Sequence, residues 1–232
     1  MNNKICGVMN CEVRSEVFNM DCLEYMKTLP DNHFDLCIAD PPYGICINES
    51  IGRRKGDANS GRKKALWDKE PPRKEVFDCL FRVSRNIVIW GANHFISRMP
   101  KQDAKCWILW DKKFSDQVSF SQFEMAWTSF EGMTKKFDKS PTTKEYKFHP
   151  TQKPVELYAW ILKNFGKEGD KIFDPFLGSG SSRIAAYKMG FDFVGCEIDE
   201  EYFRLSEERF QKECKGVEFL KNGMKVVQQS LF

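Results

Sequence analysis

The stretch KIFDPFLGSGSSRIAAYKMGFDFVGCEID, residues 171–199, decides the fold of this chain. An apolar strand ends at Asp174, and the turn from Gly178 to Gly180 leads into a helix. Glycines adopt positive φ and let backbone N–H groups approach a ligand closely. The next strand ends at Glu197, about 20 residues after the turn, where an acid can accept hydrogen bonds from ribose hydroxyls. The pattern predicts a nucleotide-like ligand, and the alternative is a tight turn followed by a capping acid.

Strands and helices alternate along most of the chain. We expect strands over residues 17–21, 34–40, 86–90, 106–110, 123–130, 171–174 and 193–197. We expect helices over residues 24–28, 75–83, 153–165, 181–189 and 200–212. This alternation predicts an α/β fold with a doubly wound, mostly parallel, seven-stranded Rossmann-like sheet. The length of 232 residues fits a single domain over residues 1–232.

Composition and charge exclude several classes of protein. Apolar residues make up 41% of the chain, which is enough for a packed core, and no apolar run is long enough to span a membrane. The net charge of +3 is too small to hold nucleic acid by bulk charge, so such binding needs a local basic patch. Two basic stretches, residues 48–75 and 131–148, are predicted to be inserted loops and candidate DNA-recognition segments.

The cysteine pattern favours reduced thiols. Nine cysteines are present, an odd number, and no two have the Cys-x-x-Cys spacing of a zinc site. The N-terminus lacks the apolar stretch of a secretory signal. We therefore predict a cytoplasmic protein without a bound metal, and we expect His149 to orient its loop rather than to bind a metal.

A second motif follows the expected strand over residues 34–40. It reads Asp40-Pro41-Pro42-Tyr43. A carboxylate and a proline carbonyl can both accept hydrogen bonds from one planar amino group, which aims the nitrogen lone pair at an electrophile. Tyr43 offers a flat face on which a base could stack. The alternative is a kinked strand end with an exposed acid.

Together these segments resemble the amino-methylating DNA methyltransferases, which transfer a methyl group from S-adenosylmethionine to adenine N6 or cytosine N4. The resemblance extends over roughly residues 17–210 and rests on residues 19–22, 35–43, 149–154, 174–182 and 195–199. The catalytic loop precedes the cofactor loop, as in the beta subclass, whose fold is circularly permuted. The resemblance also implies that a homodimer is common among relatives, and it leaves open a partner nuclease.

The resemblance implies a role for each matching residue. The catalytic set is Asp40, Pro41, Pro42 and Tyr43, in which Asp40 and the Pro41 carbonyl hold the target amino group. The S-adenosylmethionine set is Asp21, Cys22, Asp40, Thr151, Lys153, Asp174, Phe176, Gly178, Gly180 and Glu197. Within it, Glu197 binds the ribose, Asp21 and Cys22 meet the adenine, and Thr151 and Lys153 lie near the methionine carboxylate. The candidate DNA-binding cations are Arg53, Arg54, Lys55, Arg62, Lys63 and Lys64.

The predicted reaction is methylation of adenine N6 in duplex DNA, by base flipping and direct displacement. In this family an initial Asp in the catalytic tetrapeptide favours adenine, with N4 of cytosine as the alternative. An RNA or protein amide methyltransferase is disfavoured, since its loop usually begins with Asn, and a non-catalytic DNA-binding module is disfavoured by the intact motif. Methylation at carbon 5 of cytosine is rejected because the chain has no Pro-Cys dipeptide. Residues 90–95 either line the base pocket or pack in the core.

Overall fold

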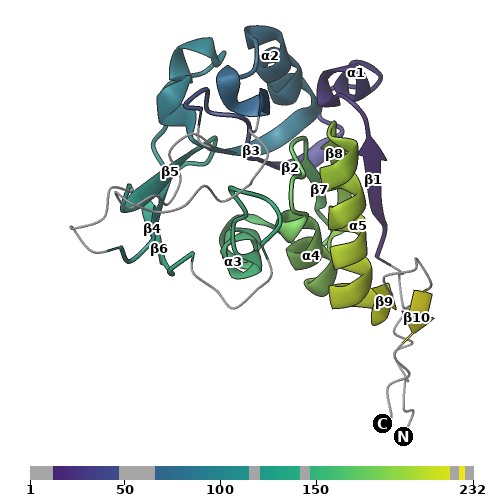
Figure 1. Cartoon of the computed structure of the whole chain (residues 1–232). Coiled ribbons are helices and arrows are strands. Elements are labelled where there is room, and N and C mark those ends of the chain that lie inside the picture. Colours follow the sequence, from purple (N-terminus) through teal and green to yellow (C-terminus); the bar gives the residue numbers. More distant parts are fainter. Residues whose placement is uncertain (1–12, 47–65, 115–120, 142–146, 220–224, 228–232) are drawn as a thin grey trace, which may run out of the picture.

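A central eight-stranded sheet organises the computed structural model, which describes residues 13–46, 66–114, 121–141, 147–219 and 225–227 (Figure 1). In spatial order the strands are β1 (Ser15–Asn19), β8 (Asp192–Glu197), β7 (Lys171–Asp174), β2 (Phe34–Ala39), β3 (Ser84–Trp90), β5 (Phe123–Thr128), β4 (Trp107–Asp111) and β6 (Lys135–Asp138). Only β5 runs antiparallel to its neighbours, β3 and β4. The prediction of a mostly parallel α/β sheet is therefore confirmed.

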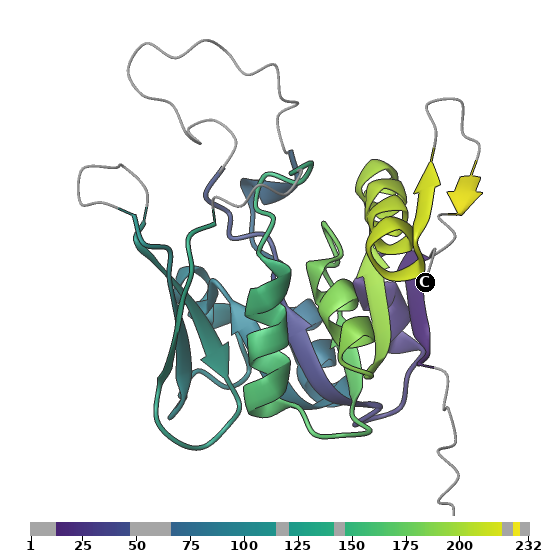
Figure 2. The same cartoon turned by 90° about the horizontal axis from the view of Figure 1, so that it is seen from below.

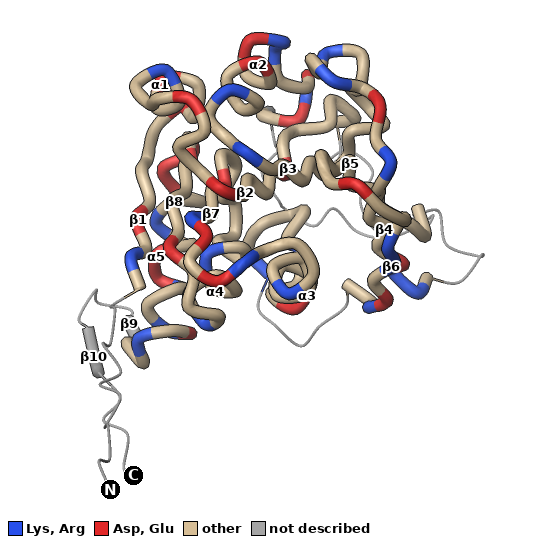
Figure 3. The backbone as a smooth tube through the Cα atoms, turned by 180° about the vertical axis from the view of Figure 1, so that it is seen from behind, with Lys and Arg blue, Asp and Glu red and all other residues tan. Residues whose placement is uncertain are grey.

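The expectation of seven strands is wrong by one strand, because β6 lies inside the segment predicted to be a basic loop. The sequence Lys135-Lys136-Phe137-Asp138 offers one apolar side chain, Phe137, which packs 5.6 Å from the ring of Trp160. The strand pairs in parallel with β4, and Lys136 lies between two acids, 3.4 Å from Asp111 and 2.9 Å from Asp138. Neighbouring acids thus compensate the charge of β6, which Figure 3 shows as adjacent blue and red segments.

The other predicted loop, residues 48–75, is also ordered in part. Residues 66–69 form the short helix η2 (Leu66–Lys69), and α2 (Lys74–Val83) begins before the predicted loop ends. Residues 47–65 lie outside the described part of the chain. Two further short helices, η3 (Ala92–His94) and η4 (Ile96–Arg98), follow β3, and a separate hairpin of β9 (Val217–Phe219) and β10 (Lys225–Val227) was not predicted.

Helices cover both faces of the sheet (Figure 2). The helices α1 (Cys22–Lys27) and α2 pack on one face, and α3 (Val155–Phe165), α4 (Ser181–Lys188) and α5 (Glu200–Lys215) lie on the other. Because successive strand side chains point to opposite faces, Leu36 and Ile38 join the core under α3, whereas Cys37 joins the core under α1 and α2. No helix of the described residues is long and apolar enough to cross a membrane.

The parallel pairing places the ends of five strands along one edge. The strands β1, β8, β7, β2 and β3 are neighbours and run in the same direction. Their carboxyl ends therefore lead into a common edge of the sheet, where ligands of open α/β sheets bind. Asp40 follows β2, Asp174 ends β7 and Glu197 ends β8, so both predicted motifs meet at this edge.

Candidate active site

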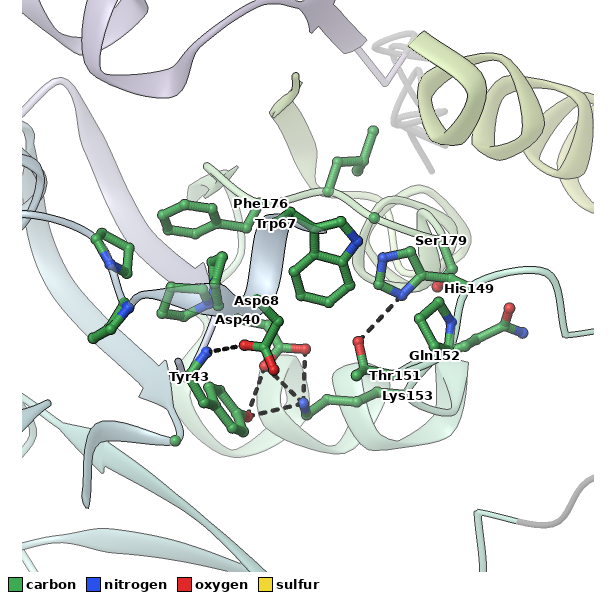
Figure 4. A pocket seen from close by; sticks show the side chains of 18 of the residues that line it. Asp40, Tyr43, Trp67, Asp68, His149, Thr151, Gln152, Lys153, Phe176 and Ser179 are labelled. Carbon is green, nitrogen blue, oxygen red and sulfur yellow. Dashed lines mark hydrogen bonds and ion pairs between the residues drawn. The ribbon is translucent and has the colours of Figure 1, made fainter. Parts of the chain in front are cut away.

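A large cavity opens at this edge of the sheet (Figure 4). Its volume is about 1470 Å³. The predicted catalytic and cofactor-binding residues that line it are Asp21, Cys22, Asp40, Pro41, Pro42, Tyr43, Thr151, Lys153, Phe176, Gly178 and Glu197. The catalytic tetrapeptide and the glycine-rich loop therefore share one space, although residues 43 and 176 are far apart in the chain.

Asp40 lies in a tight cluster of charged and polar groups. The Lys153 ammonium donates to both oxygens of the Asp40 carboxylate, at 2.7 Å each. The same ammonium lies 2.7 Å from Oε1 of Glu124, and the Tyr43 hydroxyl lies within hydrogen-bond distance of both carboxylates, 2.8 Å from Asp40 and 2.7 Å from Glu124. The Lys112 ammonium lies 2.9 Å from Oε2 of Glu124. Two acids and two bases thus balance within this cluster.

Burial and the neighbouring charges shift the pKa values of these groups. Burial raises the pKa of Asp40, the Lys153 ammonium opposes the rise, and the charge of Glu124 adds to it. Burial alone would also raise the pKa of Glu124, but the ammonium groups of Lys153 and Lys112 lower it to about 2. Although burial works against the charged form of Lys153, the two carboxylates raise its pKa. Lys153 and Glu124 are therefore both charged at neutral pH.

Tyr43 is held from several sides. The backbone N–H groups of Tyr43 and Gly44 donate to Oδ1 of Asp68, at 2.8 and 3.0 Å. The ring stacks on His94, with 5.2 Å between centroids and an angle of 15°. The backbone of Gly91 lies against the ring, since a Cβ added there would come within 2.1 Å of Tyr43. The face that could accept a base is therefore occupied by His94 in this structure.

The glycine-rich loop is held by Asp174. Its Oδ1 accepts from the backbone N–H of Phe176 at 2.9 Å, and its Oδ2 accepts from the Ser182 hydroxyl at 2.5 Å. Burial raises the pKa of Asp174 to about 7, despite these two hydrogen bonds. Gly180 has φ of +73° and is the residue before α4, so the turn needs glycine there. Asp174 and Gly180 shape the loop from behind and are not among the residues that line the cavity.

Glu197 faces the loop from the end of β8. Its Oε2 accepts from the N–H of Gly178 at 2.7 Å and its Oε1 accepts from the N–H of Asp199 at 2.9 Å. Each carboxylate oxygen has a second lone pair, so a diol in the cavity could also donate to this group. Asp21 lies beside it after β1 and accepts from the N–H of Leu23 at 2.7 Å, which starts α1. These residues fit a ribose with an attached base.

His149 closes the cavity from another side. Its ring stacks on Trp67 at 5.4 Å between centroids and meets the ring of Tyr202 edge-on at 4.4 Å. Nδ1 of His149 lies 3.1 Å from the Thr151 hydroxyl. Burial and the Lys153 charge lower the pKa of His149 to about 4, so the imidazole is neutral at pH 7. In the described part of the chain no group of potential ligands could hold a metal.

Sequence reasoning missed four residues of this site, and the six candidate DNA-binding cations lie outside the described residues. The missed residues are Lys112, Glu124, Asp68 and Trp67. For Glu124 a signal did exist, because an acid in the apolar strand Phe123–Thr128 must find a partner. The ammonium of Lys153 is bonded to Asp40 and Glu124, contacts that its implied role near the methionine carboxylate did not include.

The family follows from residues 64–208, more than half of the chain, which match the model of the N6/N4 DNA methylases. The chain belongs to the amino-methylating (N6/N4) DNA methylase family. It is therefore an S-adenosylmethionine-dependent DNA methyltransferase, as the resemblance of the motifs implied. The cavity fits this cofactor, because the acid of Glu197 and the glycine-rich loop lie beside the catalytic tetrapeptide.

Several known proteins are similar to this methylase. The type II methyltransferase M2.MboI of Moraxella bovis is 23% identical over 240 residues, which cover 84% of this chain and 87% of that protein. TTHA0409 of Thermus thermophilus, solved in complex with S-adenosyl-L-methionine, has a TM-score of 0.57 at 18% identity and covers 87% of this chain and 97% of its own. The cytosine-N4-specific PvuII DNA methyltransferase has a TM-score of 0.56 at 14% identity, and the match covers 85% of this chain and 87% of that protein. At these identities the solved structures support the fold.

Proposed function

We propose that this methylase transfers the methyl group of S-adenosylmethionine to N6 of adenine in duplex DNA. The observation that carries the proposal is the placement of Asp40 in the same cavity as the Glu197 and Gly178 site. An initial Asp in the catalytic tetrapeptide favours adenine within the family that the chain resembles. The order of the motifs supports the beta subclass and belongs to the same proposal.

Asp40 and the Pro41 carbonyl are the groups that would hold the target amino group. A carboxylate that accepts one N–H bond and a carbonyl that accepts the other orient the nitrogen lone pair toward the cavity. S-adenosylmethionine supplies an activated methyl group when bound, so no covalent enzyme nucleophile is needed. The surrounding protein contributes orientation and the exclusion of water. Tyr43 would stack on the flipped base once His94 leaves its face.

The cofactor set divides into two parts in this proposal. Glu197 would accept hydrogen bonds from the ribose, and Asp21 and Cys22 would border the adenine. Thr151 and Lys153 would lie near the methionine carboxylate, since both line the cavity between His149 and Asp40. Phe176 and Gly178 would pack against the cofactor, whereas Asp174 and Gly180 would act by shaping the loop.

The test uses the full chain with a methyl-labelled cofactor and duplex DNA. Digestion of the product to nucleosides, followed by mass spectrometry, should give N6-methyladenine. We expect Asp40→Ala to lower transfer at least 100-fold, about 3 kcal/mol in the barrier, while the binding of S-adenosylmethionine measured by calorimetry changes much less. N4-methylcytosine in the digest would overturn the choice of base, and label in RNA or protein but not in DNA would overturn the substrate.

A further inference from the structure

Asp40 shares both of its donors with a second buried carboxylate. The ammonium of Lys153 lies 2.7 Å from each oxygen of Asp40 and 2.7 Å from Oε1 of Glu124. The hydroxyl of Tyr43 lies 2.8 Å from Asp40 and 2.7 Å from Glu124. The side chain of Lys153 is 3% exposed, and those of Asp40 and Glu124 are 14% and 15% exposed. Nothing in the proposed reaction gives Glu124 a role.

Asp40 and Glu124 compete for the hydrogen-bond protons of Tyr43 and Lys153, because these are too few to satisfy both carboxylates. A phenol carries one proton, so Tyr43 donates to Asp40 or to Glu124 but not to both at once. An ammonium carries three protons, and those of Lys153 are divided among Asp40, Glu124 and the oxygen of Tyr43, which is 3.2 Å away. Every donor that engages Asp40 therefore has an acceptor on Glu124 within hydrogen-bond distance, and neither Lys153 nor Tyr43 needs to travel to reach it.

Asp40 binds an amino group more strongly after it loses donors, because only about one of its acceptor positions is free. A carboxylate offers about four acceptor positions, and Lys153 and Tyr43 already use three of those on Asp40. Releasing Asp40 from Lys153 would leave a buried ammonium without a counter-charge if Asp40 were its only partner, which is costly. Glu124 removes this cost because it already contacts the same ammonium.

We propose that Glu124 is a positioning residue that takes over the Lys153 ammonium and the Tyr43 hydroxyl when Asp40 engages the target amino group. The inference rests on the proposed function, because it names a further residue of the same site. Lys112 anchors Glu124 from the end of β4 at 2.9 Å and keeps it charged and oriented. No covalent step belongs to this handover, since only hydrogen bonds are exchanged.

The other charged and titratable groups around Asp40 leave this assignment intact. Lys153 precedes α3, Tyr158 lies on α3, Glu124 lies on β5, Lys112 follows β4, and Asp174 lies at the end of β7. Among these groups only Glu124 contacts both donors of Asp40.

The first experiment compares Glu124→Gln with the wild-type chain. We expect kcat at alkaline pH to fall about tenfold or more, since Lys153 then remains on Asp40, with less than a threefold change in KM for DNA. We expect the acid limb of kcat to move to lower pH, because the neighbouring negative charge is gone. If Glu124 acted only through its negative charge, its loss would leave Asp40 more fully ionised and would not change kcat at alkaline pH. An unchanged kcat at alkaline pH would therefore overturn the proposal.

The matched control is Glu208→Gln, which makes the same chemical change in the partly exposed ion pair with Arg204 on α5. It should leave both kcat and its pH profile unchanged. Lys112→Gln provides a second variant near the cavity rim that does not touch Asp40, and we expect it to move the acid limb to higher pH. If the acid limb of kcat in Lys112→Gln moved to lower pH, as expected for Glu124→Gln, the proposal would be overturned.

A second readout does not depend on activity. Carbon-13 NMR of aspartate-labelled protein, assigned with Asp40→Asn, follows the titration of Asp40 directly. We expect its pKa to fall in Glu124→Gln, and an unmoved titration would overturn the proposal even if kcat falls. Absence of methyl transfer to DNA by the wild-type chain would instead contradict the proposed function, whereas the NMR titration would still decide how Asp40 and Glu124 share Lys153.

Discussion

Gly91 shows how far a single residue controls the catalytic loop. Its φ is +67°, and a Cβ there would lie 2.1 Å from Cε1 of Tyr43. Gly91→Ala must therefore displace the Tyr43 ring and loosen its contacts with Asp40 and His94. We expect methyl transfer to fall at least tenfold, with a loss of about 1–3 kcal/mol in the free energy of unfolding, measured by urea denaturation.

Gly190→Ala is the matched control for this substitution. Its φ is +81°, but nothing lies within 4 Å of the added Cβ. The control therefore includes the backbone strain without the clash, and it should lose stability but keep its activity. Equal activity losses in both variants would contradict the role assigned to the contact between Gly91 and Tyr43.

Asp174 makes the stability of the free protein depend on pH. Burial raises its pKa to about 7 in the folded state, above the ordinary value of 3.8. Ionisation therefore costs stability as the pH rises from about 4 to about 7, by about 4 kcal/mol at most. We expect Asp174→Asn, which removes this charge, to become more stable relative to the wild type over that range, as measured by urea denaturation at successive pH values. A constant difference between the two proteins from pH 4 to pH 8 would show that Asp174 does not ionise in this way.

At the scale of elements, the sequence predicted most strands of the sheet and did not predict the edge strand β6. The run Phe34–Ala39 is apolar on both faces and Lys171–Asp174 is followed by a glycine turn, so both strands were recognisable. The strand Lys135–Asp138 was not, because its two lysines are typical of a loop until β4 supplies Asp111 as a partner. The contact between Lys153 and Asp40 joins residues 113 positions apart, which no local pattern reveals.

The hydrogen bonds between Asp68 of η2 and the catalytic loop also join residues that are distant in the sequence. Asp68 is 2% exposed. Its Oδ1 accepts hydrogen bonds from the backbone N–H groups of Tyr43 and Gly44, and its backbone carbonyl accepts from the N–H of Cys46 at 3.1 Å. We expect Asp68→Ala to lower the free energy of unfolding by about 2 kcal/mol, because it leaves two partly buried N–H groups without their acceptor. We also expect kcat to fall, since Tyr43 loses its anchor.

Asp68→Asn tests whether the hydrogen bonds or the charge of Asp68 matters. The amide oxygen can still accept from one or both N–H groups, so this variant should recover more than half of the stability and part of the activity. Thermal unfolding together with methyl transfer checks both. If Asp68→Asn is as damaging as Asp68→Ala, the charge of Asp68 rather than its hydrogen-bond geometry holds the loop.

At the scale of the whole molecule, the basic segment of residues 47–66 is connected at both ends to residues that line the cavity. The chain leaves the cavity at Cys46 and returns to it at Trp67, and both residues line the cavity. The cations Arg53, Arg54, Lys55, Arg62, Lys63 and Lys64 lie between these two residues in the sequence, and we call them the tethered cations. By contrast, Lys113, which follows β4, and Lys136 on β6 are paired with Asp111 and Asp138. We propose that DNA phosphates contact the tethered cations and not Lys113 or Lys136, whose charges are compensated by acids.

Replacing all six tethered cations with Gln should then weaken DNA binding and flatten its salt dependence. The slope of log K against log salt should decrease in magnitude by about 0.9 for each phosphate that is no longer neutralised. The control replaces Lys113 and Lys136 with Gln, and its slope should match the wild type because acids already compensate these lysines. Fluorescence anisotropy at several salt concentrations measures both slopes. Since the net charge of the chain is only +3, an equal weakening in the two variants would mean that total charge rather than the tethered segment attracts DNA.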